Sequence, residues 1–386
     1  MKEKFHIYYW SPFVSKVATV NAVLGSATTL RLYSKDRLVP HIINVAGEWN
    51  GYENYIKKKN IKIIKLTKLN VIDNLNFTGF FKSRVIYFFL FLVSFIPLLK
   101  LLKKNPPEYF IMHLITPLPL FLNFCFNFKT NFILRISGLP RLSILRKFFW
   151  RLTLRKVHHI TCPTKATMEL IKKYKLSDAE KISVLYDPII SNKFIMNKKK
   201  EKFDERSIEN KNYYLAIGRL TKQKNFKFLI EVFSEFLKTN DSKLIIIGEG
   251  EEKDSLQKFI KKKNLKNRVV LIGFKNNVFK YLEKSKCFIL SSLWEDPGFV
   301  LVESAYMNTP IISSDCENGP REILGFGKNG ILFKSNNKAS LLDALLRFEK
   351  MDKKEINQKL INCKKDIKVF TYFYHFKSLE KILYAN

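Results

Sequence analysis

Two glutamates bracket a short apolar segment, EDPGFVLVE, which runs from Glu295 to Glu303. A carboxylate has two acceptor oxygens, so it can bind two neighbouring hydroxyl groups, such as those of a ribose. The Pro-Gly step predicts a helix that begins at Phe299, with Glu295 before it and Glu303 one turn inside it. Ordinary helix capping is the alternative interpretation, because an acidic residue near a helix start is also stabilising there.

The same helix start has the features of a phosphate site. Pro297 and Gly298 precede the helix, which leaves the amides of Phe299 and Val300 pointing outward. Free N–H groups and the helix dipole both attract anions. The segment therefore combines hydroxyl acceptors with an anion-binding helix end.

Basic residues follow an earlier apolar run, YYLAI. The segment GRLTKQKN starts at Gly218 and contains Arg219 and Lys224. Guanidinium and ammonium donors match phosphate oxygens, so the two cations could hold a diphosphate. An arginine and a lysine on a surface loop are common, so this segment alone is not specific.

A glycine pair follows another apolar run, in the segment IIIGEGEE. Gly248 and Gly250 form a Gly-x-Gly pattern after a predicted strand. Such a pattern permits close approach of the backbone to a ligand, and a plain tight turn explains it equally well.

These segments sit in a regular alternation of predicted strands and helices. In the first half, strands are predicted over 5–10, 39–45, 61–66, 109–114, 131–136 and around 160, with helices over 17–33 and 143–154. In the second half, strands are predicted over 213–220, 243–250, 269–274, 287–292 and 310–314, with helices over 226–237, 255–265 and from 338 onward. This rhythm predicts parallel sheets with helices on both faces, where ligands bind outside the carboxyl ends of the strands.

The chain of 386 residues is long enough for two domains. We expect an α/β protein with two tandem Rossmann-like domains facing a central cleft. The predicted boundaries are residues 1–190 for the first domain, 191–212 for a polar linker and 213–365 for the second domain. Residues 366–386 are expected to form a C-terminal helix that can pack back on the first domain.

Taken together, three segments resemble a known family. GRLTKQKN, EDPGFVLVE and the sequel ESAYMNTPIISSDCENGPREIL followed by NGILF are similar to glycosyltransferase family four, whose members are retaining enzymes of the GT-B fold. The segments follow the family's order and spacing over residues 213–335, and their co-occurrence is far more specific than any one of them. The first domain resembles the family in architecture alone. The GPREI segment is common among members that build surface polysaccharides and lipid-linked oligosaccharides.

The resemblance implies a role for each matching residue. Arg219 and Lys224 would bind the diphosphate of a nucleotide sugar and neutralise its charge as it leaves, without a metal ion or other cofactor. Glu295 would bind hydroxyls of the donor sugar on the face where the bond breaks, and Glu303 would bind the ribose. Phe274 and Lys275 would lie near the base. The remaining expected donor contacts come from Gly218, Gly248, Gly298, Phe299 and Val300.

The first domain departs from the family pattern. Members often carry a histidine after the strand that here reads FILRISG, where this chain has Arg135. His113, one strand earlier, is the expected catalytic substitute, and a structural histidine is the alternative interpretation. The segment WSPFVSKVATV replaces the family's glycine-rich loop. Its Ser11, Ser15 and Lys16, together with Arg135, are expected to approach phosphate or the acceptor.

The composition is strongly basic, with 68 Lys and Arg against 34 Asp and Glu and a formal net charge of +34. This charge indicates an anionic partner, and codon bias with solvated lysines is the alternative. No nucleic-acid-binding signature accompanies the basic stretches, so nucleic acid is not expected as a partner. Five scattered cysteines without a Cys-x-x-Cys pair are typical of a reducing compartment. The N-terminus reads as a strand rather than a signal peptide, so secretion is not expected.

One uncharged segment could either be buried in the protein or contact a membrane. Residues 85–99, VIYFFLFLVSFIPLL, carry no charge, and basic residues flank them at Arg84, Lys100, Lys103 and Lys104. Three interpretations remain open: a buried helix, a helix seated in the bilayer surface, and a transmembrane span. The run is short for a span and contains a proline.

These features favour a retaining transferase bound peripherally to the inner, cytoplasmic face of the membrane. It would move a hexose or N-acetylhexosamine from a nucleotide donor, expected to be UDP-linked, to a lipid-linked or growing polysaccharide acceptor. A nucleotide-sugar epimerase of the same architecture and a non-catalytic binding module are the alternatives. The four intact charged residues Arg219, Lys224, Glu295 and Glu303 argue against a non-catalytic module. A metal-dependent transferase is not expected, because the sequence lacks the Asp-x-Asp pair that holds its ion.

Overall fold

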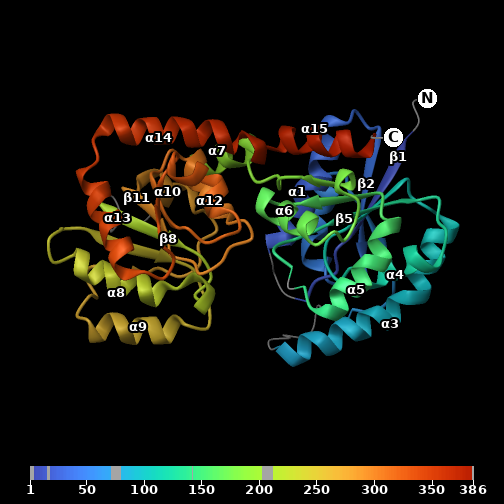
Figure 1. Cartoon of the computed structure of the whole chain (residues 1–386), viewed down its shortest axis with the longest axis horizontal. Helices are drawn as coiled ribbons and strands as arrows, with labels where there is room; N and C mark the ends of the chain where they lie inside the picture. Colours follow the sequence, from blue (N-terminus) through green and yellow to red (C-terminus); the bar gives the residue numbers. More distant parts are fainter. Residues whose placement is uncertain (1–3, 15–17, 71–79, 141, 202–211, 385–386) are drawn as a thin grey trace. The chain divides into compact units, whose positions relative to one another are not determined.

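The structure is a computed structural model that describes residues 4–14, 18–70, 80–140, 142–201 and 212–384. The chain divides into two compact units, one formed by Met1–Pro188 with Tyr372–Asn386 and the other by Ile189–Thr371. Each unit is a parallel sheet with helices on both faces (Figure 1). The last helix of the chain therefore belongs to the first unit.

The sheet of the first unit has seven parallel strands in the order β3-β2-β1-β4-β5-β6-β7. Its strands are β1 (Phe5–Trp10), β2 (Leu38–Asn44), β3 (Lys62–Lys65), β4 (Tyr109–Met112), β5 (Asn131–Arg135), β6 (His159–Cys162) and β7 (Ile182–Val184). All but β7 match segments predicted from the sequence. The strand order reverses between β1 and β4, which is where ligands bind in sheets of this kind.

Side chains alternate across this sheet and enter two separate cores. Tyr8 and Trp10 of β1 point to one face, and Ile7 and Tyr9 point to the other. The face that contains Trp10 is covered by α3 (Phe80–Lys104), α4 (Pro117–Cys125), α5 (Ile144–Thr153) and α6 (Lys165–Lys173). The face that contains Tyr9 is covered by α1 (Ala18–Tyr33), α2 (Glu53–Lys58) and α15 (Tyr372–Leu383). In this second layer α15 packs directly against α1.

The sheet of the second unit has six parallel strands in the order β10-β9-β8-β11-β12-β13. They are β8 (Tyr213–Ile217), β9 (Lys243–Ile247), β10 (Val269–Leu271), β11 (Cys287–Leu290), β12 (Ile311–Ser314) and β13 (Ile331–Phe333). This is the doubly wound order of dinucleotide-binding domains, and it reverses between β8 and β11. The β13 strand was not predicted, although it lies inside the NGILF segment.

Helices cover both faces of the second sheet. They are α8 (Phe226–Phe236), α9 (Lys253–Lys262), α10 (Phe279–Lys284), α11 (Phe299–Tyr306), α12 (Pro320–Ile323), α13 (Lys338–Lys350) and α14 (Lys353–Asp366). Helix α8 buries most of its length, because apolar residues recur on the face toward the sheet.

A further helix, α7 (Asn192–Lys200), lies in the stretch that the sequence assigned to a linker. Its Ile195 is buried, and Asn277 Nδ2 donates a hydrogen bond to the carbonyl of Lys198 at 2.8 Å. These contacts pack α7 onto α10 within the second unit. The rest of the assigned linker, residues 202–211, lies outside the described residues.

Candidate active site

Two loops meet where the strand order of the second sheet reverses. One follows β8 and carries Arg219 and Lys224, and the other follows β11 and carries Glu295. The amide of Leu293 donates to the carbonyl of Gln223 at 2.9 Å, and the Gln223 side chain donates back to the second loop at 2.9 Å. The loops are thus held together by their own hydrogen bonds, and the predicted basic and acidic residues share one site.

The Glu295 carboxylate is bound by two donors from these loops. Lys224 Nζ lies 2.5 Å from Glu295 Oε1, and Ser292 Oγ donates to the same oxygen at 2.5 Å. The Lys224 side chain is 14% exposed and the Glu295 side chain 6% exposed. Among the described residues none donates to Oε2. The carboxylate is therefore oriented through one oxygen, while the other keeps its capacity to accept from a ligand hydroxyl.

Helix α11 begins at Phe299, as the sequence predicted, directly after this carboxylate. Gly298 is its N-cap with a φ of 95°, a conformation that favours glycine, and it provides no side chain to cap the helix. The first amides of a helix have no partner within the helix, and those of Phe299 and Val300 follow Glu295 by four and five residues. The arrangement suits a negatively charged group at this point.

Glu303 lies one turn inside α11 with a partly buried side chain. Burial raises the pKa of its carboxyl to about 7. No cation among the described residues forms an ion pair with it. Hydroxyl donors from a ligand would supply the hydrogen bonds that the protein does not.

The remaining predicted donor residues are more exposed. Arg219 is exposed and forms no ion pair within the described part of the chain. Phe274 follows β10 and is 69% exposed, and Lys275 beside it is partly exposed. Strand β9 separates β10 from β8, so these two residues lie farther along the sheet edge from Glu295 than Arg219 does.

The glycines of this region are required by the packing of one loop on another. A Cβ atom at Gly248 would lie 1.8 Å from the carbonyl oxygen of Gly218, and one at Gly250 would lie 2.4 Å from that of Leu220. The amide of Leu220 donates to the carbonyl of Glu249 at 2.9 Å. The loop after β9 thus lies backbone to backbone against the loop after β8. The Gly-x-Gly pattern is explained by this contact without a ligand.

Several residues that support Glu295 were not singled out from the sequence. A Cβ atom at Gly319 would lie 1.9 Å from the Pro297 carbonyl oxygen, so the loop after β12 presses on the one after β11. Asn318 Nδ2 donates to Asp296 Oδ1 at 2.5 Å within the same contact. The signals were the serine pair Ser291 and Ser292 after β11 and the glycine of GPREI before α12, and neither reveals its partner.

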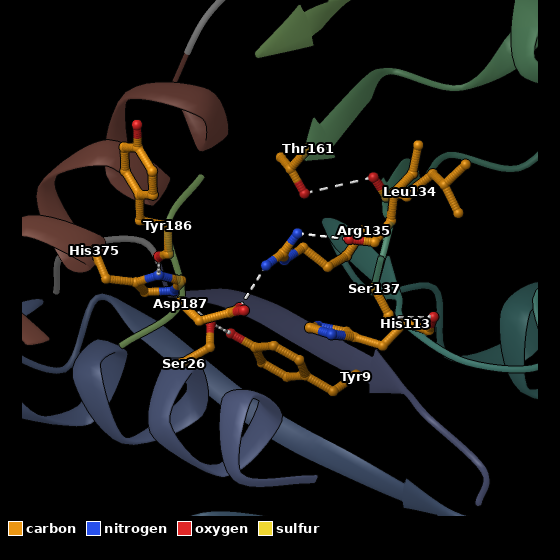
Figure 2. A network of polar contacts seen from close by, with 11 residues as sticks. Tyr9, Ser26, His113, Leu134, Arg135, Ser137, Thr161, Tyr186, Asp187 and His375 are labelled. Carbon is orange, nitrogen blue, oxygen red and sulfur yellow. Dashed lines mark hydrogen bonds and ion pairs between the residues drawn. The ribbon is translucent and has the colours of Figure 1, made fainter. Parts of the chain in front are cut away.

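In the first unit the polar residues predicted at the strand ends are buried. Ser11 follows β1, His113 follows β4 and Arg135 ends β5, with exposed fractions of 0, 6 and 3%. Arg135 Nη2 lies 2.5 Å from Asp187 Oδ1, and its Nη1 donates to the carbonyl of Ile136 at 2.7 Å (Figure 2). The sequence predicts that Arg135 binds substrate, whereas here it forms an internal ion pair. The predicted residues Ser15 and Lys16 lie outside the described residues.

His113 lines a small internal cavity. Neither of its ring nitrogens has a hydrogen-bond partner among the residues that the structure describes, and burial together with the Arg135 guanidinium holds its pKa well below the usual range. The cavity measures about 10 Å³ and is also lined by Ser26, Arg135, Thr161, Asp187 and His375. This volume admits about one water molecule and no sugar. The position favours the structural interpretation of His113 over the catalytic one.

A chain of hydrogen bonds joins α15 to the rest of this unit. His375 Nδ1 lies 2.7 Å from the carbonyl oxygen of Tyr186, and its Nε2 lies 2.9 Å from Ser26 Oγ (Figure 2). The carbonyl only accepts, so Nδ1 carries the proton and Nε2 accepts from Ser26. The Tyr9 hydroxyl then donates to Ser26 Oγ at 2.9 Å. Burial lowers the pKa of His375 to about 4, which keeps the ring neutral.

The chain is similar in sequence to known glycosyltransferases. Residues 197–366 match the family described as glycosyl transferases group 1. An uncharacterized glycosyltransferase of Methanocaldococcus jannaschii is 45% identical over 135 residues, which cover 31% of this chain and 33% of the relative. The N-acetylgalactosamine-N,N'-diacetylbacillosaminyl-diphospho-undecaprenol 4-alpha-N-acetylgalactosaminyltransferase of Campylobacter jejuni is 33% identical over 212 residues, which cover 55% of this chain and 56% of the relative. The chain thus spans about half or less of the length of these two relatives.

The fold matches solved structures over nearly the whole chain. HepE of Anabaena, solved in complex with UDP, superposes with a TM-score of 0.70 at 14% identity, covering 98% of this chain and 99% of that one. This likeness concerns the fold alone, and it covers both α/β units, including the first unit, which the family model does not reach.

Proposed function

We propose that the protein transfers a sugar from a nucleotide-diphosphate donor to an acceptor hydroxyl, because residues 197–366 match the family described as glycosyl transferases group 1. We propose further that the transfer is of the retaining type, that the donor is UDP-linked, and that the acceptor is a lipid-linked or growing saccharide at the cytoplasmic membrane face. The transferred unit would be a hexose or an N-acetylhexosamine.

One observation carries the proposal: the Lys224–Glu295 ion pair at the point where the second sheet reverses. Glu295 keeps Oε2 as an acceptor, and Lys224 keeps the remaining protons of its ammonium group for an anion. In a nucleotide sugar the phosphate oxygen is bonded to the anomeric carbon, and the free hydroxyls lie on other carbons of the same sugar. A paired acceptor and cation fit these two neighbouring groups together.

The other residues extend this arrangement along the donor. Arg219, exposed at the end of β8, would share the charge of the diphosphate with Lys224. The start of α11 at Phe299 would face the phosphate nearer the sugar. Glu303 would accept from the ribose hydroxyls, since no cation in the described part of the chain pairs with its carboxyl.

The chemical step uses these groups without a metal ion in our proposal. The bond between the anomeric carbon and the phosphate oxygen breaks, and the acceptor oxygen bonds to that carbon on the same face. The acceptor proton passes to the departing phosphate, whose growing negative charge Arg219 and Lys224 stabilise. Activity that persists in a chelating buffer would support this part of the proposal, and activity restored only by a divalent ion would contradict it.

The donor and acceptor classes draw on the relatives. HepE was solved with UDP, and the Campylobacter enzyme is named for a diphospho-undecaprenol acceptor. The basic composition of this chain also suits a donor and an acceptor that both carry diphosphate.

The decisive experiment is a donor screen followed by transfer. Thermal shifts with UDP-, GDP- and ADP-sugars identify the donor, and transfer is then measured with a polyprenyl-diphosphate saccharide as acceptor. Wild type is compared with Glu295→Ala, which is expected to lose transfer while its circular dichroism is unchanged. Full transfer by Glu295→Ala would overturn the assignment, and an isomerised free nucleotide sugar would indicate an epimerase instead.

A further inference from the structure

Helix α3 of the first unit exposes an apolar stripe along its length. Its buried side chains recur at every fourth position, at Ile86, Leu90, Ser94, Leu98 and Leu102, and most of them join the core beneath. The opposite side carries Val85, Phe88, Leu92 and Ile96, which are 69, 65, 55 and 53% exposed. Among the described residues, α3 is the one helix long and apolar enough to cross a membrane, yet only 28% of its apolar window is buried. The exposed side is therefore apolar where a soluble surface would be polar.

Helix α5 repeats this pattern on a smaller scale. Ile144, Leu145, Phe148 and Leu152 are 86, 82, 64 and 39% exposed, and their spacing puts them on one side of the helix. Trp150 and Thr153 point the other way and are buried. The two side chains at the start of α5 are almost fully in solvent, which is costly for aliphatic groups of this size.

Helix α4 packs against both α3 and α5, so the three form one continuous layer over the Trp10 face of the sheet. Figure 1 shows them together on the same side of the first unit. Helix α4 adds Phe121 and Phe124, which are 38 and 39% exposed. We name this surface the α3–α5 surface and define it by Val85, Phe88, Leu92, Ile96, Phe121, Phe124, Ile144, Leu145 and Phe148.

The segment that forms this surface is almost free of negative charge. Between residues 80 and 156 the sequence has thirteen Lys or Arg residues and one acidic residue, Glu108. Lys100 and Lys104 are exposed at the end of α3, and Arg151 is exposed on α5 beside the apolar stripe. Basic residues at the edge of an apolar surface match a bilayer of anionic lipids, whose head groups lie above their chains.

A groove beside α3 combines the same two properties. It measures about 390 Å³ and lies between the end of β3 and the second half of α3. Its floor includes Ile64, Leu66, Ile96, Pro97 and Leu101, and Lys65, Lys100 and Lys104 line it as well. Apolar walls beside three ammonium groups suit one lipid, with its chains below an anionic head group.

We propose that the α3–α5 surface inserts into the leaflet of an anionic bilayer that faces the protein and anchors the first domain there. The buried stripe of α3 belongs to the protein core, so α3 lies along the surface rather than crossing it. This inference deepens the proposed function, because it identifies the part of the first domain that would meet a lipid-linked acceptor.

Vesicle binding tests the proposal without any sugar donor, so its failure is separate from a failure of the proposed transfer. The full chain is sedimented with phosphatidylcholine vesicles that contain or lack phosphatidylglycerol. The variant Phe88→Glu/Leu145→Glu is expected to bind anionic vesicles at least tenfold more weakly than wild type. Ile361→Glu is the matched control, because Ile361 is 50% exposed on α14 of the second unit and should leave binding unchanged.

Two further measurements separate charge from insertion. Lys100→Gln/Lys104→Gln should weaken binding to anionic vesicles and leave weak binding to neutral vesicles unchanged. A Phe88→Trp variant adds one tryptophan to the fluorescence of wild type. On vesicles, the added emission should shift to shorter wavelength and should be quenched by brominated lipids. The proposal is overturned if the wild-type protein binds none of the vesicles. It is equally overturned if Phe88→Glu/Leu145→Glu binds anionic vesicles as tightly as wild type does. It is also overturned if light scattering shows that the surface joins two copies of the chain and that this dimer binds no vesicles.

Discussion

Lys224 Nζ and Glu295 Oε1 lie 2.5 Å apart although their loops follow different strands, β8 and β11. The pair ties the two loops together at the switch point of the sheet. Ser292 donates to the same oxygen, so the carboxylate cannot turn freely. The site is therefore organised before a ligand arrives, which is the condition for strong electrostatic stabilisation of a departing phosphate.

Replacing Glu295 by Gln should remove the charge but keep the size of the side chain. We expect single-turnover transfer to fall at least about 100-fold, because an amide neither orients Lys224 nor accepts as strongly from a sugar hydroxyl. The free energy of unfolding in urea should fall by about 1–3 kcal/mol, since Lys224 loses a largely buried partner. Glu283→Gln, which removes an exposed ion pair to Lys199, is the control and should change both quantities little.

Replacing Gly319 by Ala should disturb the same site through the backbone. The new Cβ would meet the Pro297 carbonyl oxygen at 1.9 Å, and the φ of 115° is unfavourable for alanine. We expect a loss of about 3 kcal/mol or more in the free energy of unfolding, measured in urea. Gly51→Ala is the comparison, because nothing lies within 4 Å of its Cβ and its cost should be small. Equal stability of both variants would contradict the role assigned to Gly319.

Local sequence patterns were sufficient to predict most of the scaffold. Alternating apolar segments located β1 and β8, and the Pro-Gly step located the start of α11 at Phe299. Each of these signals depends on neighbours in sequence. Strands β7 and β13, each three residues long, were not predicted, whereas the equally short β10 opens the longer apolar segment VVLIGF.

Contacts between distant segments could not be predicted in the same way. Gly248 looked like a ligand contact, but its close neighbour is the backbone of Gly218. His113 looked like a catalytic residue at a strand end, but α15, from the far end of the chain, helps to enclose its cavity. The run 85–99 is uncharged by composition, and its division into buried and exposed stripes depends on what α3 packs against.

The raised pKa of Glu303 predicts a pH dependence of donor binding. With a pKa of about 7, half of the carboxyl groups are protonated at neutral pH. The ionised form accepts hydrogen bonds from ribose hydroxyls better than the protonated form does. The Kd for a nucleotide sugar should therefore fall as the pH rises through this pKa, from about 6 to about 8. A nucleotide sugar is suitable because its diester diphosphate does not titrate in this range.

The variant Glu303→Gln isolates this effect. It should bind the nucleotide sugar more weakly at pH 8 and show no pH dependence from this group. Folding should respond in the opposite direction: the folded pKa lies above the unfolded value of 4.5, so ionisation destabilises the fold as pH rises from 4.5 to 7. Calorimetric titrations of both proteins would reject the assignment if their pH profiles coincide.

The Arg135–Asp187 pair should matter for stability rather than chemistry. Both side chains are almost fully buried, at 3 and 8% exposure, so Asp187→Ala leaves a buried guanidinium without its ion-pair partner. We expect a loss of about 3–5 kcal/mol in the free energy of unfolding. The double variant Arg135→Met/Asp187→Leu should recover much of this loss, because no buried charge remains. A catalytic role for Arg135 would instead appear as lost transfer in the double variant despite recovered stability.

His375 should make the first domain sensitive to acid. Its pKa is about 4 in the folded protein and 6.5 as the ordinary value, so the folded state disfavours the protonated ring. The stability that this depressed pKa reflects is fully present above pH 6.5 and is lost progressively as pH falls toward 4. The loss over this window should be about 2–3 kcal/mol, following from the size of the shift.

His375→Gln tests this assignment. It should be less stable than wild type at pH 7.5, because the bonds to Tyr186 and Ser26 change, but its stability should decline less on acidification. His41 and His159, whose pKa values are also about 4, are present in both proteins, so the difference between the two curves isolates His375. The free energy of unfolding in urea is measured for both proteins between about pH 4.5 and 7.5. If it changes with pH in the same way in both, the protonation of His375 does not change on unfolding.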